Sequence, residues 1–351
     1  MATFLMLVGL PGSGKSTLAN ELKSNNFLTS GYERKRPEAI ILSSDKIREE
    51  LYGDESIQDN PEQVFKLMFE RTVENLNNGL DVIYDATNLN RKKRINLLTE
   101  LKRKVKQYFD KYCFVVYCDI TECLQRNKLR DRHVPEDVIF QMLKSFEIPV
   151  DGEGWNRIEI KYSTKPNIPY KDAVNLFCGC LAHDNPHHLL DVDEHMYATE
   201  YYLLNEYKQP FILPIHVKYA ALFHDIGKAM CKTFKNKKGE ISEIAHYYNH
   251  ANVGAYLSLG INFDNFQDRS ELGPINKFTE SNKYYMAVLI NFHMRPLEAW
   301  KESKKSYEKD WKLLGDWMTY YLKIINTCDE NSEEPKFVKK YLKLKENNCA
   351  R

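Results

Sequence analysis

The sequence lacks three things: an excess of one charge, a long hydrophobic run and a C-x-x-C pair of cysteines. Basic residues number 50 and acidic residues 49, so any contact with nucleic acid must come from a local patch and not from a strongly basic domain. No apolar stretch approaches the roughly 20 residues that span a bilayer, which predicts no membrane segment. The 8 cysteines without a C-x-x-C pair favour reduced thiols and a cytoplasmic location.

The length of the chain points to more than one domain, because 351 residues are long for a single hydrophobic core. Residues 1–162 alternate short apolar runs with helical patterns, which predicts an α/β domain with a parallel sheet. Residues 163–177 begin with the proline and polar side chains that are typical of a linker. Residues 178–351 hold long periodic segments and 9 of the 10 histidines, and we expect an all-α domain there.

A phosphate-binding motif lies near the start of the first domain. Residues 9–16 read G-L-P-G-S-G-K-S and match G-x-x-x-x-G-K-[ST]. The apolar run at 4–8 leads directly into this motif, so we interpret it as a buried strand and not as a signal peptide, and a helical pattern follows at 17–22. In such a loop Lys15 reaches the β- and γ-phosphates of ATP and Ser16 ligates Mg²⁺. The predicted ATP-binding residues here are Gly9, Gly12, Ser13, Gly14, Lys15, Ser16 and Thr17.

Charged residues follow two further predicted strands. A strand at 39–43 leads into a helix at 44–51, which places Asp45 and Arg48 one turn apart beside the phosphates. The alternative is that Asp45 only caps the helix while Arg48 is a solvated charge. A third strand ends in Asp85, whose carboxylate can support Mg²⁺ or can simply be a turn residue at the end of the strand.

Two basic segments complete the first domain. Residues 91–106 carry lysines and arginines at helical spacing, and we favour a surface helix with a solvated basic face over an RNA-binding patch. After a fourth strand at 113–117, a helical segment at 123–132 puts Arg126 and Arg130 on one face, where the pair can close over a triphosphate. Residues 158–160 are the predicted last strand.

Residues 1–162 resemble the kinase domain of the bacteriophage-type polynucleotide 5′-kinases, within the P-loop kinase superfamily. The resemblance rests on the phosphate loop, on S-D-K-I-R at 44–48, on D-A-T-N-L-N at 85–90, and on R-N-x-x-R at 126–130 followed by V-P at 134–135. It implies a catalytic set of Lys15, Asp45 and Arg130, in which Asp45 is the general base for the acceptor 5′-hydroxyl. It also implies lid contacts from Arg126 and Arg130 to the donor phosphates. The residues expected at the acceptor are Arg48, Asp85 and Asn88.

The second domain contains histidines and aspartates that suit a divalent transition metal. The candidate ligands are His195, His224, Asp225, His250, His293 and Asp329. Taken one at a time, each of these histidines is more readily explained as a hydrogen-bonded core residue. The remaining histidines stay unassigned, although His187 and His188 are a candidate pocket mouth.

Taken in order, these residues resemble the HD metal-phosphohydrolase superfamily, and more closely the HD domains attached to tRNA nucleotidyltransferases, over residues 180–335. The resemblance implies a core metal site of His195, His224, Asp225 and Asp329. It implies a second metal at His250 and His293, and Lys228 facing the substrate phosphate. The expected ions are one or two of Mn²⁺, Ni²⁺, Co²⁺ or Fe²⁺, which lower the pKa of a bound water towards about 7 for attack on a phosphoester.

The two activities together predict an enzyme that heals the ends of a broken strand. The first domain would phosphorylate 5′-hydroxyl ends of RNA or DNA, and the second would remove 2′,3′-cyclic, 2′ or 3′ phosphates. A separate polynucleotide ligase is then the expected partner, and no membrane is involved. The alternative is a nucleoside or metabolite kinase whose HD domain is a regulatory nucleotide-binding module.

Overall fold

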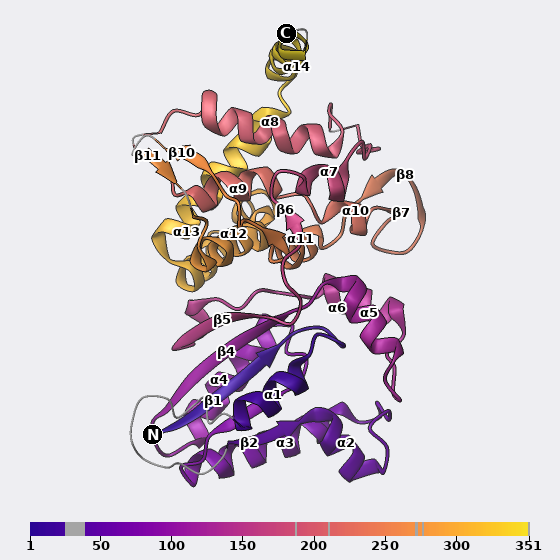
Figure 1. Cartoon of the computed structure of the whole chain (residues 1–351), viewed down its shortest axis with the longest axis vertical. Helices are drawn as coiled ribbons and strands as arrows, with labels where there is room; N and C mark the ends of the chain where they lie inside the picture. The colour runs from indigo at the N-terminus through magenta and orange to yellow at the C-terminus, as the bar shows by residue number, and fades with distance from the viewer. Residues whose placement is uncertain (25–38, 187, 210, 271–272, 276, 350–351) are drawn as a thin grey trace. The chain divides into compact units, whose positions relative to one another are not determined.

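The structure is a computed structural model of the whole chain, and it describes all residues except 25–38, 187, 210, 271–272, 276 and 350–351 (Figure 1). His187, one of the two candidate pocket-mouth residues, therefore lies outside the described residues. The chain divides into two compact units: an N-terminal unit of Met1–Met142 with Pro149–Lys165, and a C-terminal unit of Leu143–Ile148 with Pro166–Arg351. Each unit is described by itself.

The N-terminal unit is an α/β domain built on a parallel sheet, as the sequence predicts. The strands lie in the order β2-β3-β1-β4-β5, and all four neighbouring pairs are parallel. Its elements are β1 (Ala2–Val8), α1 (Lys15–Ser24), β2 (Ile40–Ser43), α2 (Ser44–Tyr52), α3 (Pro61–Asn77), β3 (Val82–Asp85), α4 (Arg91–Lys104), β4 (Phe109–Tyr117), α5 (Ile120–Lys128), α6 (Glu136–Lys144), the short 3-10 helix η2 (Asp151–Glu153) and β5 (Arg157–Tyr162).

The strand β1 is buried along its whole length because it pairs with β3 on one side and β4 on the other. Leu5 and Leu7 project from one face of β1 and pack with Ala19 and Leu22 of α1. The strand order reverses at the carboxyl end of β1, which is where open α/β sheets bind their ligands. The start of α1 and the helix α5 both lie at this end of the sheet (Figure 1).

Three local predictions differ from the structure of this unit. The strand β4 begins at Phe109, not at 113, because its half-buried first residues pair with Ala2–Leu5 of β1. The helix α5 starts at Ile120, where Asp119 caps it by accepting the Thr121 N–H at 2.9 Å, and it ends at Lys128. Arg130 consequently lies beyond the helix, so the prediction of one helical face for Arg126 and Arg130 is wrong.

The prediction of a solvated basic face on α4 does not hold for every charged side chain of this helix. Arg94 is 1% exposed and makes a bidentate pair with Glu153 of η2, with Nε···Oε2 at 2.8 Å and Nη2···Oε1 at 2.6 Å. Its Nη1 also donates to the carbonyl oxygens of Asn88 and Leu89, at 3.0 and 2.9 Å. Arg94 is therefore a structural clamp between the end of β3 and η2, whereas its neighbours Lys92 and Lys93 are exposed.

The C-terminal unit is mainly helical, as the sequence predicts, with short two-stranded ribbons between helices (Figure 1). Its elements are β6 (Ile168–Pro169), α7 (Ala173–Cys178), α8 (Val192–Asn205), α9 (Ile215–Phe223), α10 (Lys228–Cys231), β7 (Thr233–Lys235), β8 (Ile241–His246), α11 (His250–Ser258), β9 (Ile261–Asn262), β10 (Asp268–Ser270), β11 (Gly273–Ile275), α12 (Glu280–Phe292), the π-helix η3 (Pro296–Trp300), α13 (Lys304–Ser332) and α14 (Pro335–Cys349).

Two segments of this unit differ from the sequence-based expectation of a linker at 163–177 followed by an all-α domain. The stretch 163–177 contains β6, which pairs with β9, and most of α7, so part of the expected linker is folded into the unit. The hairpin β7–β8 turns at Asn236–Gly239, where Gly239 has φ +84 as such a turn requires.

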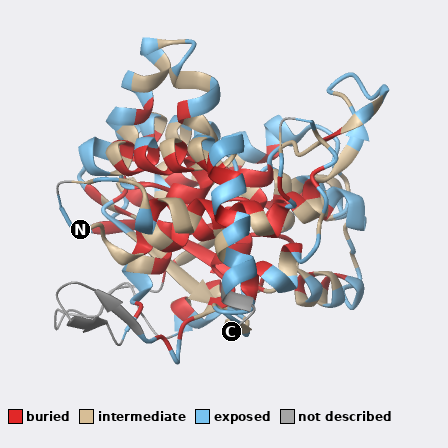
Figure 2. Ribbon diagram, turned by 90° about the horizontal axis from the view of Figure 1, so that it is seen from above, coloured by how far each residue is buried: buried red, intermediate tan, exposed pale blue. Residues whose placement is uncertain are grey.

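Buried positions otherwise follow the inner faces of the helices and the strands (Figure 2). Within the described part of the chain, no helix has both the length and the apolar character to cross a membrane.

Candidate active site in each unit

The phosphate loop of the N-terminal unit has a backbone that only glycine adopts at two positions. Gly12 has φ +77, and a Cβ there would lie 2.3 Å from the carbonyl oxygen of Cys123. Gly14 has φ +89, and a Cβ there would lie 2.7 Å from the hydroxyl of Ser163. The loop is tied to the sheet by the bond from the Gly9 N–H to the Thr87 carbonyl oxygen at 3.1 Å. These constraints hold the loop open towards a phosphate.

A cavity of about 680 Å³ opens beside this loop. Five of the seven predicted loop residues line it together with both predicted lid arginines: Gly12, Gly14, Lys15, Ser16, Thr17, Arg126 and Arg130. The other two loop residues shape the loop from behind. A Cβ on Gly9 would lie 2.8 Å from the carbonyl oxygen of Val116, and Ser13 is fully buried with no hydrogen-bond partner for its hydroxyl. The cavity is also lined by Lys161 and Tyr162 at the end of β5 and by Ser163 directly after it, which sequence reasoning did not single out.

The hydroxyl and carboxylate expected at a magnesium ion lie side by side. Ser16 Oγ donates to Asp85 Oδ2 at 2.7 Å, across 69 residues of sequence. Hydroxyl and carboxylate oxygens are the ligands that Mg²⁺ prefers, so this pair fits the ion. Burial raises the pKa of Asp85, partly offset by Ser16 and Lys15, and burial likewise lowers the pKa of Lys15 against the pull of Asp85. The Lys15 ammonium donates to the Leu10 carbonyl oxygen at 2.7 Å, and so folds back along the loop.

Asp45 lies among three arginines. Nη1 of Arg48 and Nη1 of Arg132 each lie 2.8 Å from Asp45 Oδ1, while Nη2 of Arg130 lies 3.8 Å from Oδ2. Asp45 is thus more than a helix cap, and its two oxygens differ: Oδ1 contacts two arginines closely, whereas the nearest cation to Oδ2 is Arg130 at 3.8 Å. The sequence analysis did not identify Arg132. Its position two residues after Arg130, a predicted lid arginine, could have indicated it.

Two predicted residues of the N-terminal unit have partners inside the fold. Asn88 has φ +51, and its amide donates to the carbonyl oxygens of Leu7 at 2.7 Å and Ala86 at 3.2 Å, which joins the ends of β1 and β3. These bonds support a structural role for Asn88 beside the site. Arg126 donates to Glu122 Oε1 at 2.6 Å and to Ser163 Oγ at 2.5 Å, so it is already oriented along the cavity wall.

The C-terminal unit brings all six predicted metal ligands into two adjoining groups. His195, His224 and Asp329 form one group, and Asp225, His250 and His293 form the other. The Nε2 atoms of His195 and His224 are 3.2 Å apart, and those of His250 and His293 are 3.1 Å apart. Nitrogens that share one ion at about 2.1 Å are expected roughly 3.0–3.4 Å apart, so both spacings fit a metal.

Asp225 joins the two groups through its two carboxylate oxygens. Its Oδ2 lies 3.2 Å from His224 Nε2, while its Oδ1 lies 3.2 Å from His250 Nε2 and 3.7 Å from His293 Nε2. A carboxylate so placed can contact two ions at once. Asp329 Oδ1 lies 2.9 Å from His195 Nε2 and 3.6 Å from His224 Nε2, so it belongs to the first group. With a side chain 23% exposed, Asp329 lies at the open side of an otherwise buried cluster.

The tautomers of the histidines are set by the backbone. Nδ1 of His224, His250 and His293 each lies 2.8 Å from the carbonyl oxygen three residues earlier, namely that of Ala221, Tyr247 and Ile290. A carbonyl only accepts, so Nδ1 carries the hydrogen and Nε2 is left to ligate. His224 and His293 end their helices, where such carbonyls have no helical partner.

The fourth histidine is held by a carboxylate that sequence reasoning missed. His195 Nδ1 lies 2.7 Å from Glu333 Oε1, and Glu333 also accepts from His188 Nδ1 and from the Leu189 N–H, each at 3.0 Å. Although burial raises the pKa of Glu333, the bonds from His188 and His195 hold it well below its usual range. Glu333 lies four residues after Asp329, a spacing that places both on one face of α13 and that could have revealed it.

The charges at the centre favour bound cations. Burial opposes ionisation, yet His224 and Lys228 hold the pKa of Asp225 well below its usual range, and His224 with His195 does the same for Asp329. In turn, Asp225 and Asp329 overcome the effect of burial and raise the pKa of His224 to about 10. Three carboxylates therefore meet one fixed ammonium, that of Lys228, and positive charge must be supplied by protons or by metal ions.

Lys228, predicted to face the substrate phosphate, is 6% exposed and makes contacts inside the cluster. Its ammonium lies 2.7 Å from Asp225 Oδ2 and 3.0 Å from His183 Nε2. His183 donates from Nδ1 to the Leu190 carbonyl oxygen at 2.6 Å and stacks on His188, with ring centroids 3.8 Å apart. The Lys228 ammonium beside His183 opposes a third metal there, so His183, His188 and Glu333 act as support for the first group.

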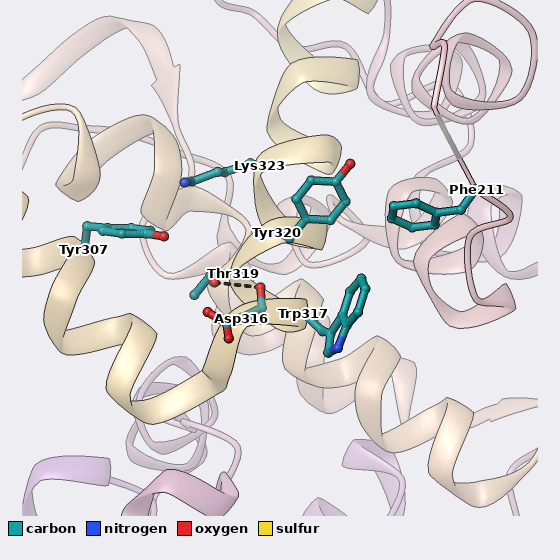
Figure 3. A pocket seen from close by; sticks show the side chains of 7 residues that line it. All are labelled: Phe211, Tyr307, Asp316, Trp317, Thr319, Tyr320 and Lys323. Atoms are coloured by element: carbon teal, nitrogen blue, oxygen red, sulfur yellow. Dashed lines mark hydrogen bonds between the residues drawn. The ribbon is translucent and has the colours of Figure 1, made fainter.

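A separate pocket of about 360 Å³ lies where α13 is kinked at Gly315 (Figure 3). Its lining is Phe211, Tyr307, Asp316, Trp317, Thr319, Tyr320 and Lys323. Tyr320 precedes Asp329 by nine residues, which at 3.6 residues per turn puts the two on opposite faces of α13. This pocket is therefore not part of the metal-ligand cluster.

The phosphate loop between β1 and α1, within this parallel sheet, defines a P-loop domain. Residues 4–149 match the family model described as "AAA domain". Over 177 residues the chain is 29% identical to the L-seryl-tRNA(Sec) kinase of Methanococcus maripaludis, which covers 49% of this chain and 63% of that protein. The chain thus spans less than two thirds of the length of this relative.

Several solved structures are similar to part of this chain. A structure titled as the Pnkp1/Rnl/Hen1 RNA repair complex is 22% identical with a TM-score of 0.32, covering 41% of this chain and 44% of that one. A putative kinase from Chloroflexus aurantiacus j-10-fl is 14% identical with a TM-score of 0.37, covering 47% and 87%. A gluconokinase from Sinorhizobium meliloti 1021 is 15% identical with a TM-score of 0.31, covering 47% and 84%. At these scores, the fold assignment rests on the sheet order and the phosphate loop.

Proposed function

We propose that this chain is a bifunctional enzyme that heals nucleic-acid ends. Its N-terminal unit transfers the γ-phosphate of ATP to a 5′-hydroxyl end, and its C-terminal unit removes 2′,3′-cyclic, 2′ or 3′ phosphates as an HD-type metal phosphohydrolase. The observation that carries the proposal is that the chain holds two separate clusters, a cavity lined by Lys15, Arg126 and Arg130 and a group of histidines and aspartates around Asp225.

In the N-terminal unit, Lys15, Arg126 and Arg130 supply the positive charge that holds and stabilises the donor phosphates. Asp45 accepts the proton of the attacking hydroxyl, and Arg48 binds a phosphate of the acceptor strand. Mg²⁺ held by Ser16 and Asp85 would neutralise charge on the donor phosphates. The kinship with a kinase named for a seryl-tRNA substrate supports an acceptor hydroxyl carried on RNA.

In the C-terminal unit, His195, His224 and Asp329 would hold one ion and His250 and His293 a second, and the carboxylate of Asp225 lies between the two groups. Divalent ions of the Mn, Fe, Co or Ni group held there would supply a nucleophilic water at neutral pH and neutralise the phosphate. Nδ1–H bonds keep the histidines in the ligating tautomer, and Lys228 fixes the orientation of Asp225. Asp329 lies at the exposed edge, where a terminal phosphate can reach the cluster.

The two reactions complement each other on opposite ends of one break. Cleavage that leaves a 5′-hydroxyl and a 2′,3′-cyclic phosphate creates ends that a ligase cannot join. Phosphorylation of one end and removal of phosphate from the other produces the 5′-phosphate and 3′-hydroxyl that a ligase requires. We therefore expect a separate polynucleotide ligase to act after this protein.

The test uses oligonucleotides with defined ends. A 5′-hydroxyl oligonucleotide incubated with radiolabelled ATP and Mg²⁺ should gain label, and Lys15→Ala should abolish the transfer while Lys66→Ala, at an exposed lysine of α3, should not. Oligonucleotides ending in a 2′,3′-cyclic or 3′ phosphate should lose it when Mn²⁺, Ni²⁺, Co²⁺ or Fe²⁺ is added. Transfer to nucleosides or sugars but not to oligonucleotides, with metal bound and no phosphate released, would instead support a metabolite kinase with a regulatory HD domain.

A further inference from the structure

We propose that Arg132 is a positioning residue of the kinase reaction, which orients Asp45 for proton transfer when the segment after α5 covers the donor phosphates. The inference rests on the proposed role of Asp45 as general base and adds to it which carboxylate oxygen acts and what holds it.

The two oxygens of Asp45 have different surroundings. Oδ1 accepts charge-assisted bonds from both Arg48 and Arg132, each at 2.8 Å. Oδ2 has Arg130 at 3.8 Å, which is beyond hydrogen-bond distance. With Oδ1 occupied on two sides, Oδ2 is the oxygen that can accept the proton of an incoming hydroxyl.

The two arginines reach Asp45 from different parts of the fold. Arg48 lies three residues along the same helix, α2, and its side chain is 9% exposed, so its contact is local and fixed. Arg132 comes from the segment after α5, 87 residues away in sequence, and its side chain is 17% exposed. Only the second contact depends on how this segment lies against α2.

The segment that carries Arg132 is closed into a short loop. Asn127, 1% exposed, donates from Nδ2 to the Val134 carbonyl oxygen at 2.8 Å and accepts the Val134 N–H on Oδ1 at 3.0 Å. Arg130 and Arg132 lie within this loop, and Arg130 lines the donor cavity. Because one side chain closes this loop at both ends, Arg130 at the donor cavity and Arg132 at Asp45 are held on the same short segment, which links the donor site to the orientation of Asp45.

Loss of Arg132 should therefore affect the chemical step more than the binding of either substrate. The remaining bond from Arg48 leaves Asp45 free to turn about its side-chain torsions, and misplacement of a catalytic group by about 1 Å can cost roughly a hundredfold in rate. We expect Arg132→Ala to lower kcat by about tenfold to a hundredfold while KM for ATP changes little.

The experiment measures kcat and KM with a 5′-hydroxyl oligonucleotide and ATP for Arg132→Ala, Arg132→Lys and Arg103→Ala. Arg103 is an exposed arginine of α4 paired with Glu100, so its variant controls for loss of a surface charge. Added guanidinium should restore part of the activity of Arg132→Ala and none of that of Asp45→Ala, an effect that a merely structural role would not produce. Arg132→Lys should be intermediate, since one ammonium replaces a planar fork.

Each outcome separates this inference from the proposed function. An unchanged kcat in Arg132→Ala, or a loss that appears only in KM for the oligonucleotide, overturns the positioning role while a dead Asp45→Ala keeps the general base. Full activity of Asp45→Ala overturns the assignment of the base and this inference with it, while Lys15→Ala still reports whether the unit is a kinase.

Discussion

The candidate sites of the two units have opposite arrangements of charge. The N-terminal unit surrounds a cavity with backbone N–H groups, Lys15 and arginines, so the protein itself supplies the positive charge. The C-terminal unit surrounds Asp225 and Asp329 with imidazoles, so the protein supplies ligands and positive charge must arrive from outside. The first arrangement suits an anion, whereas the second suits cations.

This difference explains how the two sites are distributed along the chain. A phosphate cradle can be made from one continuous loop because consecutive N–H groups point inwards, and eight residues suffice here. A metal cluster needs side chains to approach from several directions, and the candidate ligands come from α8, α11 and α13 and from the residues that directly follow α9 and α12. The first site is local, and the second exists only when the helices have packed.

The sharpest way to break this comparison is to remove the carboxylate that both metal positions share. Asp225→Asn should abolish phosphate release and reduce bound metal to less than one ion per chain, because it removes the negative charge between the histidines. Kinase activity should stay within about twofold of the parent, since its site depends on other side chains. Metal content measured by mass spectrometry, together with both assays, checks this.

The control for that variant is Asp264→Asn, at an exposed aspartate of the same unit. If Asp225→Asn also silences the kinase while the fold persists by circular dichroism, then the independence of the two chemistries is wrong.

The stability of the N-terminal unit offers the next test. Arg94→Met should cost about 3–5 kcal/mol, because it removes the bidentate cation of the fully buried Glu153 carboxylate and leaves only Arg91, at 3.6 Å, as a charged partner. Trp155 donates to the same carboxylate at 3.1 Å and is the tryptophan of this unit, so its fluorescence reports the loss during urea unfolding. Lys93→Met, at an exposed position of α4, should cost less than about 0.5 kcal/mol. A matching loss in the metal content of the C-terminal unit would contradict separate folding.

A smaller effect should follow from loosening one histidine of the metal cluster. Glu333→Gln keeps the shape of the side chain but removes the charge that holds His195, which should weaken metal binding by about tenfold to a hundredfold. Titration of the metal-free protein with Mn²⁺ or Co²⁺ in a calorimeter measures this without reference to activity. Glu334→Gln, at the exposed neighbour, should bind as the parent does, and equal affinity in both variants would remove Glu333 from the site.

The mildest test concerns the thiols. Three described cysteines of the N-terminal unit, Cys113, Cys118 and Cys123, are buried, whereas Cys180 of the C-terminal unit is exposed. Burial also raises the pKa of Cys231 to about 11 and that of Cys328 to about 12, which makes their thiols poor nucleophiles at pH 8. Brief alkylation followed by peptide mapping should therefore label Cys180 before these cysteines. Early labelling of Cys123, beside the phosphate loop, would show that the N-terminal unit opens.

Much of the fold could be predicted because its signals are local. The strand at 4–8, the glycine loop and the helix after it follow from apolar runs and turn residues within about twenty positions. Two predictions failed for different reasons: Arg130 lies beyond α5 because the helix begins and ends earlier than its pattern indicates, and Arg94 is buried because Glu153, distant in sequence, lies opposite it. Pattern and spacing contain no information on such partners.

By itself the sequence determined the identity of the phosphate loop, the α/β and helical halves, and a set of residues with the right chemistry for metal ions. Only the tertiary structure decided that those residues meet, that Asp225 reaches both groups, and that Glu333 and Arg132 belong to the two sites. The physical reason is one of range: backbone shape and hydrophobic period act between neighbours in sequence, whereas ligation and ion pairing need atoms within a few ångströms that the chain supplies from far apart.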